Sequence, residues 1–250
     1  MVLNGKVALV SGTGPNIGAE IARTLADNGA LVGCMDMNSE YANAAAKTIN
    51  DSGGKATGLV ADITDPLSVK EAVETLIDTF GSIQLLVNNA AISDHKPFLE
   101  AELSEWQKTL DVILNGTFIV SQTVARKMVE QRKAGAIVNM ISTSGHRGET
   151  SRIAYGTAKS GLLNFTRSTA MQLAPHKIRV NSVTPTVTGT PVGLPDAPRD
   201  DNNPPKEVPL HRWGRPSDQA QAVLFLLSPN ADFITGIDLP CDGGRLAQFY

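Results

Sequence analysis

The sequence predicts an α/β fold in which a doubly wound parallel sheet carries helices on both faces. Three observations lead to this prediction. Short apolar runs alternate with amphipathic helical segments along the 250 residues without a break. A glycine-rich turn joins the first strand to the first helix, and a buried strand ends in a polar loop at Ser142. Parallel strands joined by helices cross over right-handedly, which gives a doubly wound sheet. Because the alternation never breaks, we expect one domain over residues 1–250.

The amino terminus predicts a site for a diphosphate. Val7 to Val10 reads as a short buried strand, residues 11–18 form the glycine-rich turn, and an amphipathic helix runs from Ala19 to Asn28. Backbone amides in such a turn can approach an anion closely, and the helix dipole favours negative charge. Gly12 and Gly18 serve this close approach.

The second strand, Ala30 to Met35, ends in Asp36, about 20 residues beyond the glycines. A carboxylate at this place can accept hydrogen bonds from both hydroxyls of an adenosine ribose. It would repel a 2′-phosphate, and neither Met37 nor Asn38 offers that phosphate a positive charge. Asp36 therefore predicts NAD rather than NADP.

The middle of the chain continues the alternation. We expect helices over Ser39 to Ser52, Pro66 to Phe80 and Ser104 to Arg132. Asp65 and Pro66 open the second of these, and Ser104 with Gln107 forms a capping box that opens the third.

The apolar run from Ala136 to Ile141 reads as a buried parallel strand. Ser142 then lies at its carboxyl end, where open α/β sheets bind their ligands. The residues alone leave Ser144 as an equally reachable hydroxyl.

The next helix, Ile153 to Leu173, places Tyr155 and Lys159 on one face because they are four residues apart. Lowering the pKa of a tyrosine from about 10 by roughly three units needs about 4 kcal/mol. One cation about 4 Å away supplies that at an effective dielectric of about 20. We therefore expect Lys159 to lower the pKa of Tyr155, which makes the phenol a base.

Six prolines between Pro191 and Pro209 interrupt the alternation. An excursion of this length in a compact domain is a lid or a disordered loop. The last expected helix runs from Ser217 to Leu227.

With these elements in place, the chain resembles the short-chain dehydrogenase/reductase family over essentially its whole length. The matching motifs follow the family's order: Ser11-Gly12-Thr13-Gly14-Pro15-Asn16-Ile17-Gly18, Asp62, Asn88-Asn89-Ala90-Ala91, Asn115, Ser142, Tyr155 with Lys159, Pro185-Thr186-Val187-Thr188-Gly189-Thr190 and Asp242-Gly243-Gly244. The resemblance implies a single-domain Rossmann-like fold and places the family's substrate loop at about 191–209.

The resemblance also implies site residues. The catalytic set is Asn115, Ser142, Tyr155 and Lys159, where Asn115 holds a water that links Lys159 to solvent or, alternatively, only bends or bridges its helix. The cofactor-binding set is Gly12, Asn16, Ile17, Gly18, Asp36, Asp62, Ile63, Asn89, Ala90, Tyr155, Lys159, Pro185, Thr188 and Thr190.

Three residues replace glycines of the family pattern: Asn16, Ala91 and Thr186. Asparagine tolerates a left-handed backbone better than other residues with a side chain, so we expect Asn16 to keep the loop conformation. Ala91 and Thr186 add side-chain volume near the expected cofactor.

The implied reaction is hydride transfer between NAD and a secondary alcohol or its ketone. Ser144, Glu149 and Arg152 approach the expected pocket, which predicts a small polar substrate such as a polyol or a hydroxy acid. Alternatively, Arg152 points to solvent or pairs with Glu149. A 3-oxoacyl thioester reductase is a second interpretation, and a non-catalytic dinucleotide sensor is a third from another class.

Composition and surface pattern bear on partners. A net charge of −3 leaves no basic footprint for nucleic acid, and the longest apolar run is far shorter than a membrane span. The two cysteines and four histidines lack ligand spacing, so we expect no metal. The two cysteines fit an intracellular compartment, and we expect a cytoplasmic protein. In the family that the chain resembles, the two long helices pair across a two-fold axis. This pairing, with four apolar residues expected on the exposed sides of these helices, predicts a homotetramer: Ile113, Phe118, Leu162 and Phe165.

Overall fold

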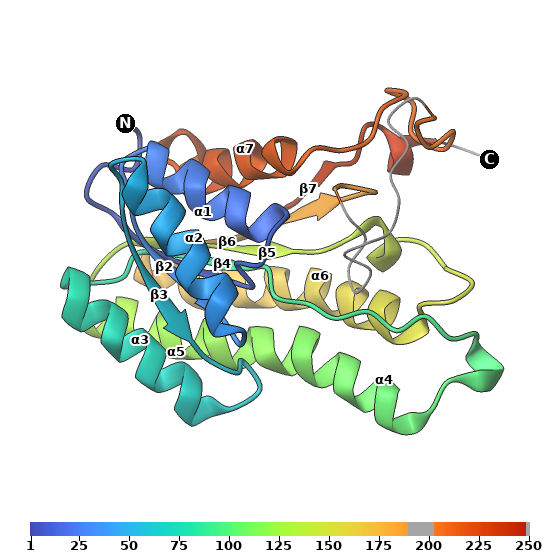
Figure 1. The fold of residues 1–250 in the computed structure, drawn as a ribbon, viewed down its shortest axis with the longest axis horizontal. Coiled ribbons are helices and arrows are strands. Elements are labelled where there is room, and N and C mark those ends of the chain that lie inside the picture. Colours follow the sequence, from blue (N-terminus) through green and yellow to red (C-terminus); the bar gives the residue numbers. More distant parts are fainter. Residues whose placement is uncertain (190–202, 249–250) are drawn as a thin grey trace.

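The computed structural model describes residues 1–189 and 203–248 and contains a seven-stranded parallel sheet between two layers of helices (Figure 1). The strand order is β3-β2-β1-β4-β5-β6-β7, which confirms the predicted fold class. The strands are β1 (Val7–Ser11), β2 (Leu31–Asp36), β3 (Lys55–Val60), β4 (Leu85–Asn88), β5 (Gly135–Met140), β6 (Ile178–Pro185) and β7 (Asp238–Cys241).

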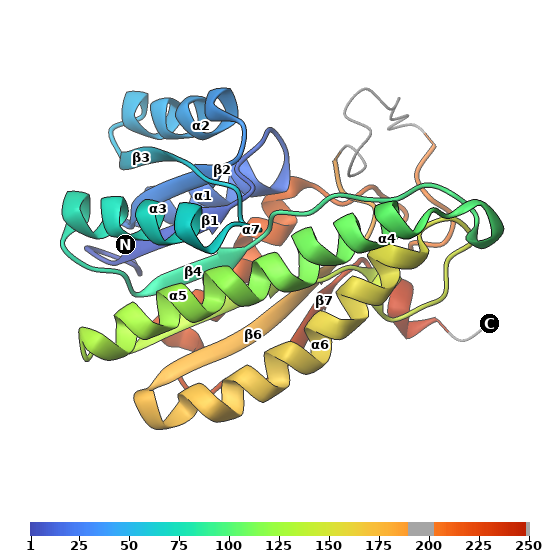
Figure 2. The same cartoon turned by 90° about the horizontal axis from the view of Figure 1, so that it is seen from below.

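The helices divide between the two faces of the sheet (Figures 1 and 2). One face is covered by α1 (Ile17–Asp27), α2 (Ser39–Asp51) and α7 (Pro216–Leu227). The other is covered by α3 (Pro66–Phe80), α5 (Gly116–Glu130) and α6 (Ile153–Leu173), and α4 (Leu103–Leu110) precedes α5.

The two core layers follow from alternation along the strands. In β1, Val7 and Leu9 pack with the α3 and α5 layer, whereas Ala8 and Val10 pack with the α1 and α7 layer. All four are at most 1% exposed. Because helices cover both faces, β1, β4 and β5 are buried on both sides, which explains their continuous apolar runs in the sequence.

Helix starts depend on local capping, and the two expected caps have different outcomes. Asp65 accepts a hydrogen bond from the Leu67 amide at 2.9 Å, which confirms it as the cap of α3. The expected cap at Ser104 is wrong: α4 begins at Leu103, one residue earlier, and Glu102 precedes it without a side-chain cap. Ser104 therefore lies inside the first turn.

The single helix expected from Ser104 to Arg132 is interrupted. A π-helical turn, Asp111–Asn115, separates α4 from α5. Ile113 in this turn and Leu162 in α6 are buried against Tyr155, so the expectation that they are exposed is wrong. Phe118 remains 49% exposed and Phe165 is half-buried.

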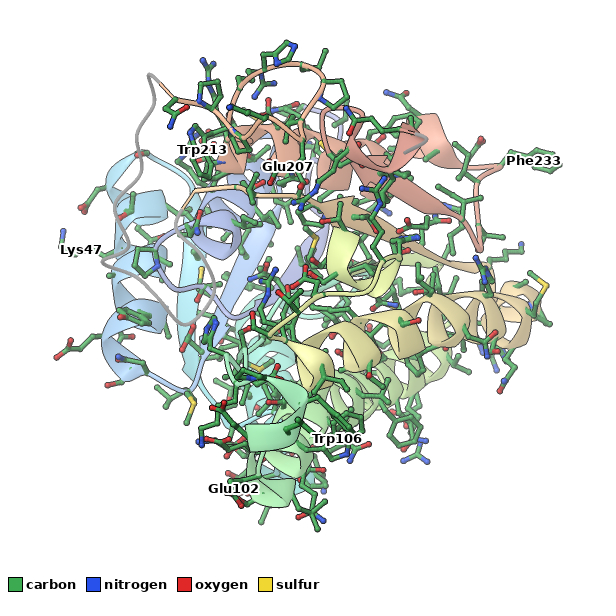
Figure 3. The ribbon with its side chains drawn as sticks, turned by 90° about the vertical axis from the view of Figure 1, so that its right-hand side faces the viewer. Lys47, Glu102, Trp106, Glu207, Trp213 and Phe233 are labelled. Atoms are coloured by element: carbon green, nitrogen blue, oxygen red, sulfur yellow. The ribbon has the colours of Figure 1, made fainter. Side chains whose placement is uncertain are left out.

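The sheet reverses its strand order at β1, which pairs with β2 on one side and β4 on the other. Connections from these strands leave the sheet in opposite directions, so a crevice opens at their carboxyl ends. Figure 3 looks toward this end of the molecule.

Candidate active site

The glycine-rich segment after β1 packs directly on the loop that follows β4. Gly12 has φ +72°, and a Cβ on it would lie 2.6 Å from the Cα of Ala90. The Asn89 side chain donates to the Gly12 carbonyl oxygen at 2.7 Å, and Ser11 Oγ accepts from the Asn89 amide at 3.1 Å. Glycine is therefore required at position 12, and the segment reaches the amino end of α1 in a fixed path.

Asn16 has a backbone conformation that differs from the expected left-handed one. Its φ of 144° and ψ of −130° lie in a region that only glycine adopts readily. Its side chain packs on Gly189, where a Cβ would lie 2.0 Å from Asn16 Oδ1. The asparagine thus retains a glycine-like backbone while its side chain contacts the segment that follows β6.

A groove of about 840 Å³ opens beside the glycine-rich segment. Asp36 lies at its edge and accepts hydrogen bonds from the amides of Gly14 at 3.1 Å and Asn38 at 3.0 Å. The groove brings together most of the residues predicted for the adenosine end of a cofactor: Gly12, Asp36, Asp62, Ile63 and Ala90.

A second, smaller cavity lies at the carboxyl ends of β5 and β6 and shares Ala91 with the groove. Its volume is about 140 Å³. The cavity brings together most of the remaining predicted residues: Asn16, Ile17, Asn89, Ser142, Ser144, Arg152, Tyr155, Lys159, Pro185 and Thr188. Thr190 and residues 191–202 of the expected substrate loop lie outside the described residues.

Ser142 and Tyr155 line the same cavity, and the Ser142 hydroxyl donates to Ser144 Oγ at 3.1 Å. Burial raises the pKa of Tyr155 above its usual value, because a phenolate is poorly solvated there. The nearby hydroxyl of Ser142 and the positive charge of Arg152 oppose this rise in the pKa, whereas the negative charge of Glu149 adds to it.

Lys159 is 3% exposed and donates to the Met140 carbonyl oxygen at 2.6 Å. Its Nζ lies 5.7 Å from the centre of the Tyr155 ring, and burial lowers the pKa of Lys159 to about 7. The expectation that Lys159 lowers the pKa of Tyr155 is therefore wrong for this structure. Burial disfavours the charged form of both groups and is the largest influence on each pKa.

Asn115 lies in the groove rather than in the cavity of Tyr155. It ends the π-helical turn, is exposed, and donates to the Asp111 carboxylate at 2.7 Å. Asn115 lies where the helix is interrupted, which agrees with the alternative that this residue only bends or bridges its helix. That Asn115 holds a water linking Lys159 to solvent stays a prediction.

Ser144, Glu149 and Arg152 form one polar cluster at the cavity. Arg152 donates to Glu149 through Nε at 2.5 Å and Nη2 at 2.7 Å, and to Ser144 at 3.3 Å. Ser144 in turn donates to Glu149. The guanidinium also lies over the Tyr155 ring, 5.3 Å from its centre. Arg152 is thus paired with Glu149, the alternative that the sequence left open, and lines the cavity as well.

Asp94, in the loop after β4, was missed in the sequence. Its carboxylate accepts from the amides of Ala154 at 3.0 Å and Tyr155 at 2.9 Å. It therefore caps α6 from 60 residues away and fixes the backbone of Tyr155. In the sequence, only the position of Asp94 in a loop at the carboxyl end of a strand pointed to a role at the site.

Two further cavity residues, Trp213 and Arg245, were also missed. Arg245 follows the Asp242-Gly243-Gly244 segment directly, and Trp213 lies shortly before α7. A position next to a matched motif was the only signal for Arg245.

Within residues 1–189 and 203–248, no three His, Cys, Asp or Glu side chains are grouped so that they could hold a metal ion. In the same ranges, the apolar stretch needed for a membrane crossing is not reached by any helix.

Comparison with known proteins gives matches over nearly the whole chain. A family model described as enoyl-(acyl carrier protein) reductase matches residues 12–245. A 3-oxoacyl-[acyl-carrier-protein] reductase of Aquifex aeolicus is 39% identical over 243 residues, which cover 97% of this chain and 98% of that protein. A D-threitol dehydrogenase of Mycolicibacterium smegmatis is 37% identical over 244 residues, covering 97% and 93% respectively.

The fold is equally well matched among solved structures. The crystal structure of a short-chain type dehydrogenase/reductase from Mycobacterium marinum superposes with a TM-score of 0.92 at 34% identity. The match covers 98% of this chain and 97% of that one.

Proposed function

The chain belongs to the short-chain dehydrogenase/reductase family, and we propose that it is an NAD-dependent dehydrogenase of a small, polar secondary alcohol. Membership of this family makes the chain an oxidoreductase that uses a nicotinamide dinucleotide. The observation that carries the proposal is that Ser142, Tyr155 and Lys159 line one cavity at the carboxyl ends of β5 and β6.

The described residues fit a dinucleotide. Gly12 allows no side chain because a Cβ on it would meet Ala90, so the glycine-rich turn packs closely on the loop after β4 and leads to the amino end of α1. Asp36 and Asp62 lie in one groove, and the cavity of Tyr155 adjoins it through Ala91. We propose that the groove holds adenosine and that Asn89, Pro185 and Thr188 line the nicotinamide end. When bound, the nicotinamide supplies the acceptor for the hydride of the carbinol carbon.

The chain's own side chains handle the proton. Tyr155, as phenolate, takes the proton of the substrate hydroxyl, and Ser142 donates a hydrogen bond to the oxygen as it becomes a carbonyl. In the reverse direction the protonated phenol returns that proton to the ketone. Lys159 lines the same cavity, with its Nζ 5.7 Å from the centre of the Tyr155 ring.

Cofactor preference rests on Asp36. Its carboxylate lies at the end of β2, and the next two residues, Met37 and Asn38, carry no charge that could pair with a 2′-phosphate. We propose a kcat/KM that favours NAD over NADP by a large factor, and Asp36→Ala should narrow the difference. A native preference for NADP would refute the argument.

The substrate class has support from polar side chains in the cavity and from one relative. Ser144 and Arg152 line the cavity, and the relative in M. smegmatis is a D-threitol dehydrogenase, threitol being a small polyol. The relative in A. aeolicus reduces 3-oxoacyl groups on acyl carrier protein, so a thioester ketoreductase is the second candidate. Ser142 and Tyr155 would have the same roles in a thioester ketoreductase. This second candidate would be favoured if the protein turned over 3-oxoacyl thioesters with NADPH faster than it turned over alcohols with NAD.

The direct test is incubation of the pure protein with NAD and a panel of secondary alcohols while the absorbance of the reduced cofactor is followed. Tyr155→Phe should lose about two to four orders of magnitude in turnover, the usual contribution of a positioned acid or base. Binding of NAD should remain nearly unchanged. Turnover retained in Tyr155→Phe removes Tyr155 from its role, and binding of NAD without turnover of any substrate favours the sensor.

We further propose a cytoplasmic homotetramer. Two free cysteines, with the pKa of Cys34 raised by burial to about 12, suit a reducing compartment. Exposed apolar side chains on two separate regions of the surface support self-association.

A further inference from the structure

Arg245 lines the same cavity as Ser142 and Tyr155, although it lies only five residues from the end of the chain. It begins the 3₁₀ turn η6 (Arg245–Ala247) after β7. The cavity therefore receives a guanidinium from the carboxyl-terminal segment, in addition to that of Arg152.

The backbone at Arg245 is held in place from two sides. The Asp242 carboxylate accepts from the amides of Gly244 at 2.9 Å and Leu246 at 2.7 Å. Arg147, in the segment between Ser142 and Tyr155, donates to the Arg245 carbonyl oxygen at 2.6 Å. The carboxyl-terminal segment is thus fixed to the segment that carries the catalytic residues, and Arg245 has a defined position relative to them.

The guanidinium itself has few partners. Nη1 donates to Thr186 Oγ1 at 3.1 Å, and Nη2 lies 3.5 Å from Glu207, whose side chain is 42% exposed. Nε is buried and has no hydrogen-bond partner among the described residues. Figure 3 shows Glu207 and Trp213 on the same side of the opening at the strand ends. A buried donor of this kind is costly unless an acceptor reaches it.

Arg152 differs in this respect. Two of its nitrogens already bind the Glu149 carboxylate at 2.5 and 2.7 Å. A substrate anion at Arg152 would have to displace Glu149 from two hydrogen bonds, whereas at Arg245 it would meet an unpartnered Nε and an Nη2 whose carboxylate partner, Glu207, is 3.5 Å away.

From these contacts we propose that Arg245 binds the carboxylate of the substrate, so that the enzyme acts on hydroxy acids rather than on neutral polyols. This inference rests on the proposed function, because Ser142 and Tyr155 must hold the carbinol of the same molecule. A planar carboxylate can take two parallel hydrogen bonds from a guanidinium, which a polyol hydroxyl cannot match.

The test compares matched substrates: 3-hydroxybutyrate, its neutral amide 3-hydroxybutyramide, and threitol. Arg245→Gln should raise KM for the acid by roughly tenfold or more, as expected for a lost charge-assisted pair, and leave KM for the amide and the Kd for NAD unchanged. Arg245→Lys should give a smaller rise, because it keeps the charge without the fork.

Arg167→Gln is the charge-matched control. Arg167 is exposed on α6, twelve residues or about 18 Å along the helix from Tyr155. It should change none of the three KM values. A rise in KM for the acid in this variant equal to that in Arg245→Gln would assign the effect to net charge and overturn the inference.

Binding gives a readout that does not need turnover. Butyrate, which lacks the reacting hydroxyl, should bind the enzyme with NAD present in calorimetry and should bind Arg245→Gln about tenfold more weakly. If Arg245→Gln bound NAD more weakly but bound butyrate as before, Arg245 would belong to the cofactor site. If the native enzyme and Arg245→Gln both preferred threitol, the cavity would be a polyol site. Either result overturns the inference. Inactivity of the native enzyme on all three substrates, with butyrate still bound through Arg245, would instead count against the proposed function alone.

Discussion

At the scale of single residues, the environment of Tyr155 sets the pH dependence of the proposed reaction. Burial raises the pKa of the phenol, so at neutral pH it is protonated and suited to donate its proton to a ketone. Oxidation of an alcohol needs the phenolate, and its kcat should therefore rise with pH throughout the alkaline range. Ketone reduction should lack that rise.

Arg152 and Glu149 provide opposite tests of this electrostatic account. The positive charge of Arg152 lowers the pKa of Tyr155 and the negative charge of Glu149 raises it. Arg152→Gln should shift the pH profile of oxidation to higher pH, and Glu149→Gln should shift it to lower pH. The profiles are measured with saturating cofactor, and shifts of the same sign in both variants would contradict the account.

Lys159 makes the stability of the protein depend on pH. Its pKa is lowered to about 7 in the folded state, so the unfolded chain takes up a proton between about pH 10.5 and 7 that the folded chain does not. Stability should therefore fall with falling pH across that window, by about 1.4 kcal/mol per unit, and this contribution should level off below about pH 7. Lys159→Met should be more stable than the native protein at pH 7 and nearly equal to it at high pH.

Urea unfolding of both proteins at neutral and alkaline pH measures this difference. The contributions of the other titrating groups to the free energy of unfolding are the same in both proteins, so they cancel in the difference. A Lys159→Met variant that is less stable than the native protein at neutral pH would show that the contact with the Met140 carbonyl outweighs desolvation. The variant should be inactive in either case, which separates the stability of this site from its use.

Asp94 positions Tyr155 through the backbone. Its carboxylate takes up the Ala154 and Tyr155 amides, and loss of a cap costs about 0.5–2 kcal/mol. Asp94→Ala should lower kcat by roughly ten- to a hundredfold, because a displacement of about 1 Å at a reacting group has such an effect. KM should change less than kcat.

The matched control for Asp94 is Asp65→Ala, which removes the cap of α3. It should lose a similar stability in thermal unfolding while kcat remains near native. Asp94→Asn adds a readout specific to positioning: it keeps the size of the side chain and one acceptor oxygen for the amides, so its kcat should lie between those of the native protein and of Asp94→Ala. Equal losses of kcat in Asp94→Ala and Asp65→Ala would reduce Asp94 to a general stabilising role.

At the scale of elements, the sequence was sufficient where local pattern decides the structure. Apolar runs placed the strands because both faces of the sheet are buried, and Asp65 with Pro66 marked the start of α3. The π-helical turn at Asp111–Asn115 was not predictable, since one inserted residue hardly changes the periodicity of a long helix. The cap from Asp94 depends on a contact across 60 residues, which no local pattern records.

The active site shows the same division. Motif positions brought Ser142, Tyr155 and Lys159 into one cavity, but the charge states of the last two depend on burial, which a helical spacing does not reveal. Leu162 follows the same rule: its helix was predicted, but its burial comes from contact with Ile113 and Ile141. Spacing in the sequence thus predicts neighbours, and the surrounding elements decide their electrostatics.

The glycine-rich turn after β1 carries strain at Asn16. A residue with a side chain in this glycine-like region costs of the order of 1–3 kcal/mol, and Asn16→Gly should relieve it. The extra freedom of glycine in the unfolded chain offsets about 0.4–1 kcal/mol of that gain. We therefore expect a net rise in the unfolding temperature of about 2–4 °C per kcal/mol gained.

Asn28→Gly is the comparison for Asn16→Gly. Asn28 ends α1 with φ −98° and donates to the Thr24 carbonyl oxygen at 2.9 Å, so glycine there should lower the unfolding temperature. Thermal unfolding without and with NAD measures both variants. A lower unfolding temperature in Asn16→Gly would show that the contact with Gly189 stabilises more than the backbone conformation costs.

At the scale of the whole molecule, two of the regions that carry exposed apolar side chains are candidates for association. The first lies at the edge strand β7 and α7, where Phe233 is 100%, Phe225 41% and Ile237 39% exposed, and Figure 3 shows Phe233 pointing away from the fold. The second lies along α4 and α5, where Leu103 is 69% and Phe118 49% exposed. Edge strands and apolar patches of this kind favour association.

Two separate regions on one chain are what a tetramer with two kinds of two-fold interface requires. Light scattering of the native protein should give a mass of about 106 kDa, four times 26.5 kDa.

Phe233→Asp should disrupt the interface at β7 and Phe118→Asp the interface at α5, because each places a charge in an apolar contact. Each variant should then give a dimer of about 53 kDa, twice 26.5 kDa, and the double variant a monomer. Lys47→Asp, on the exposed side of α2, is the control and should remain tetrameric. A native mass of 26.5 kDa at micromolar concentration would show that neither region is an interface.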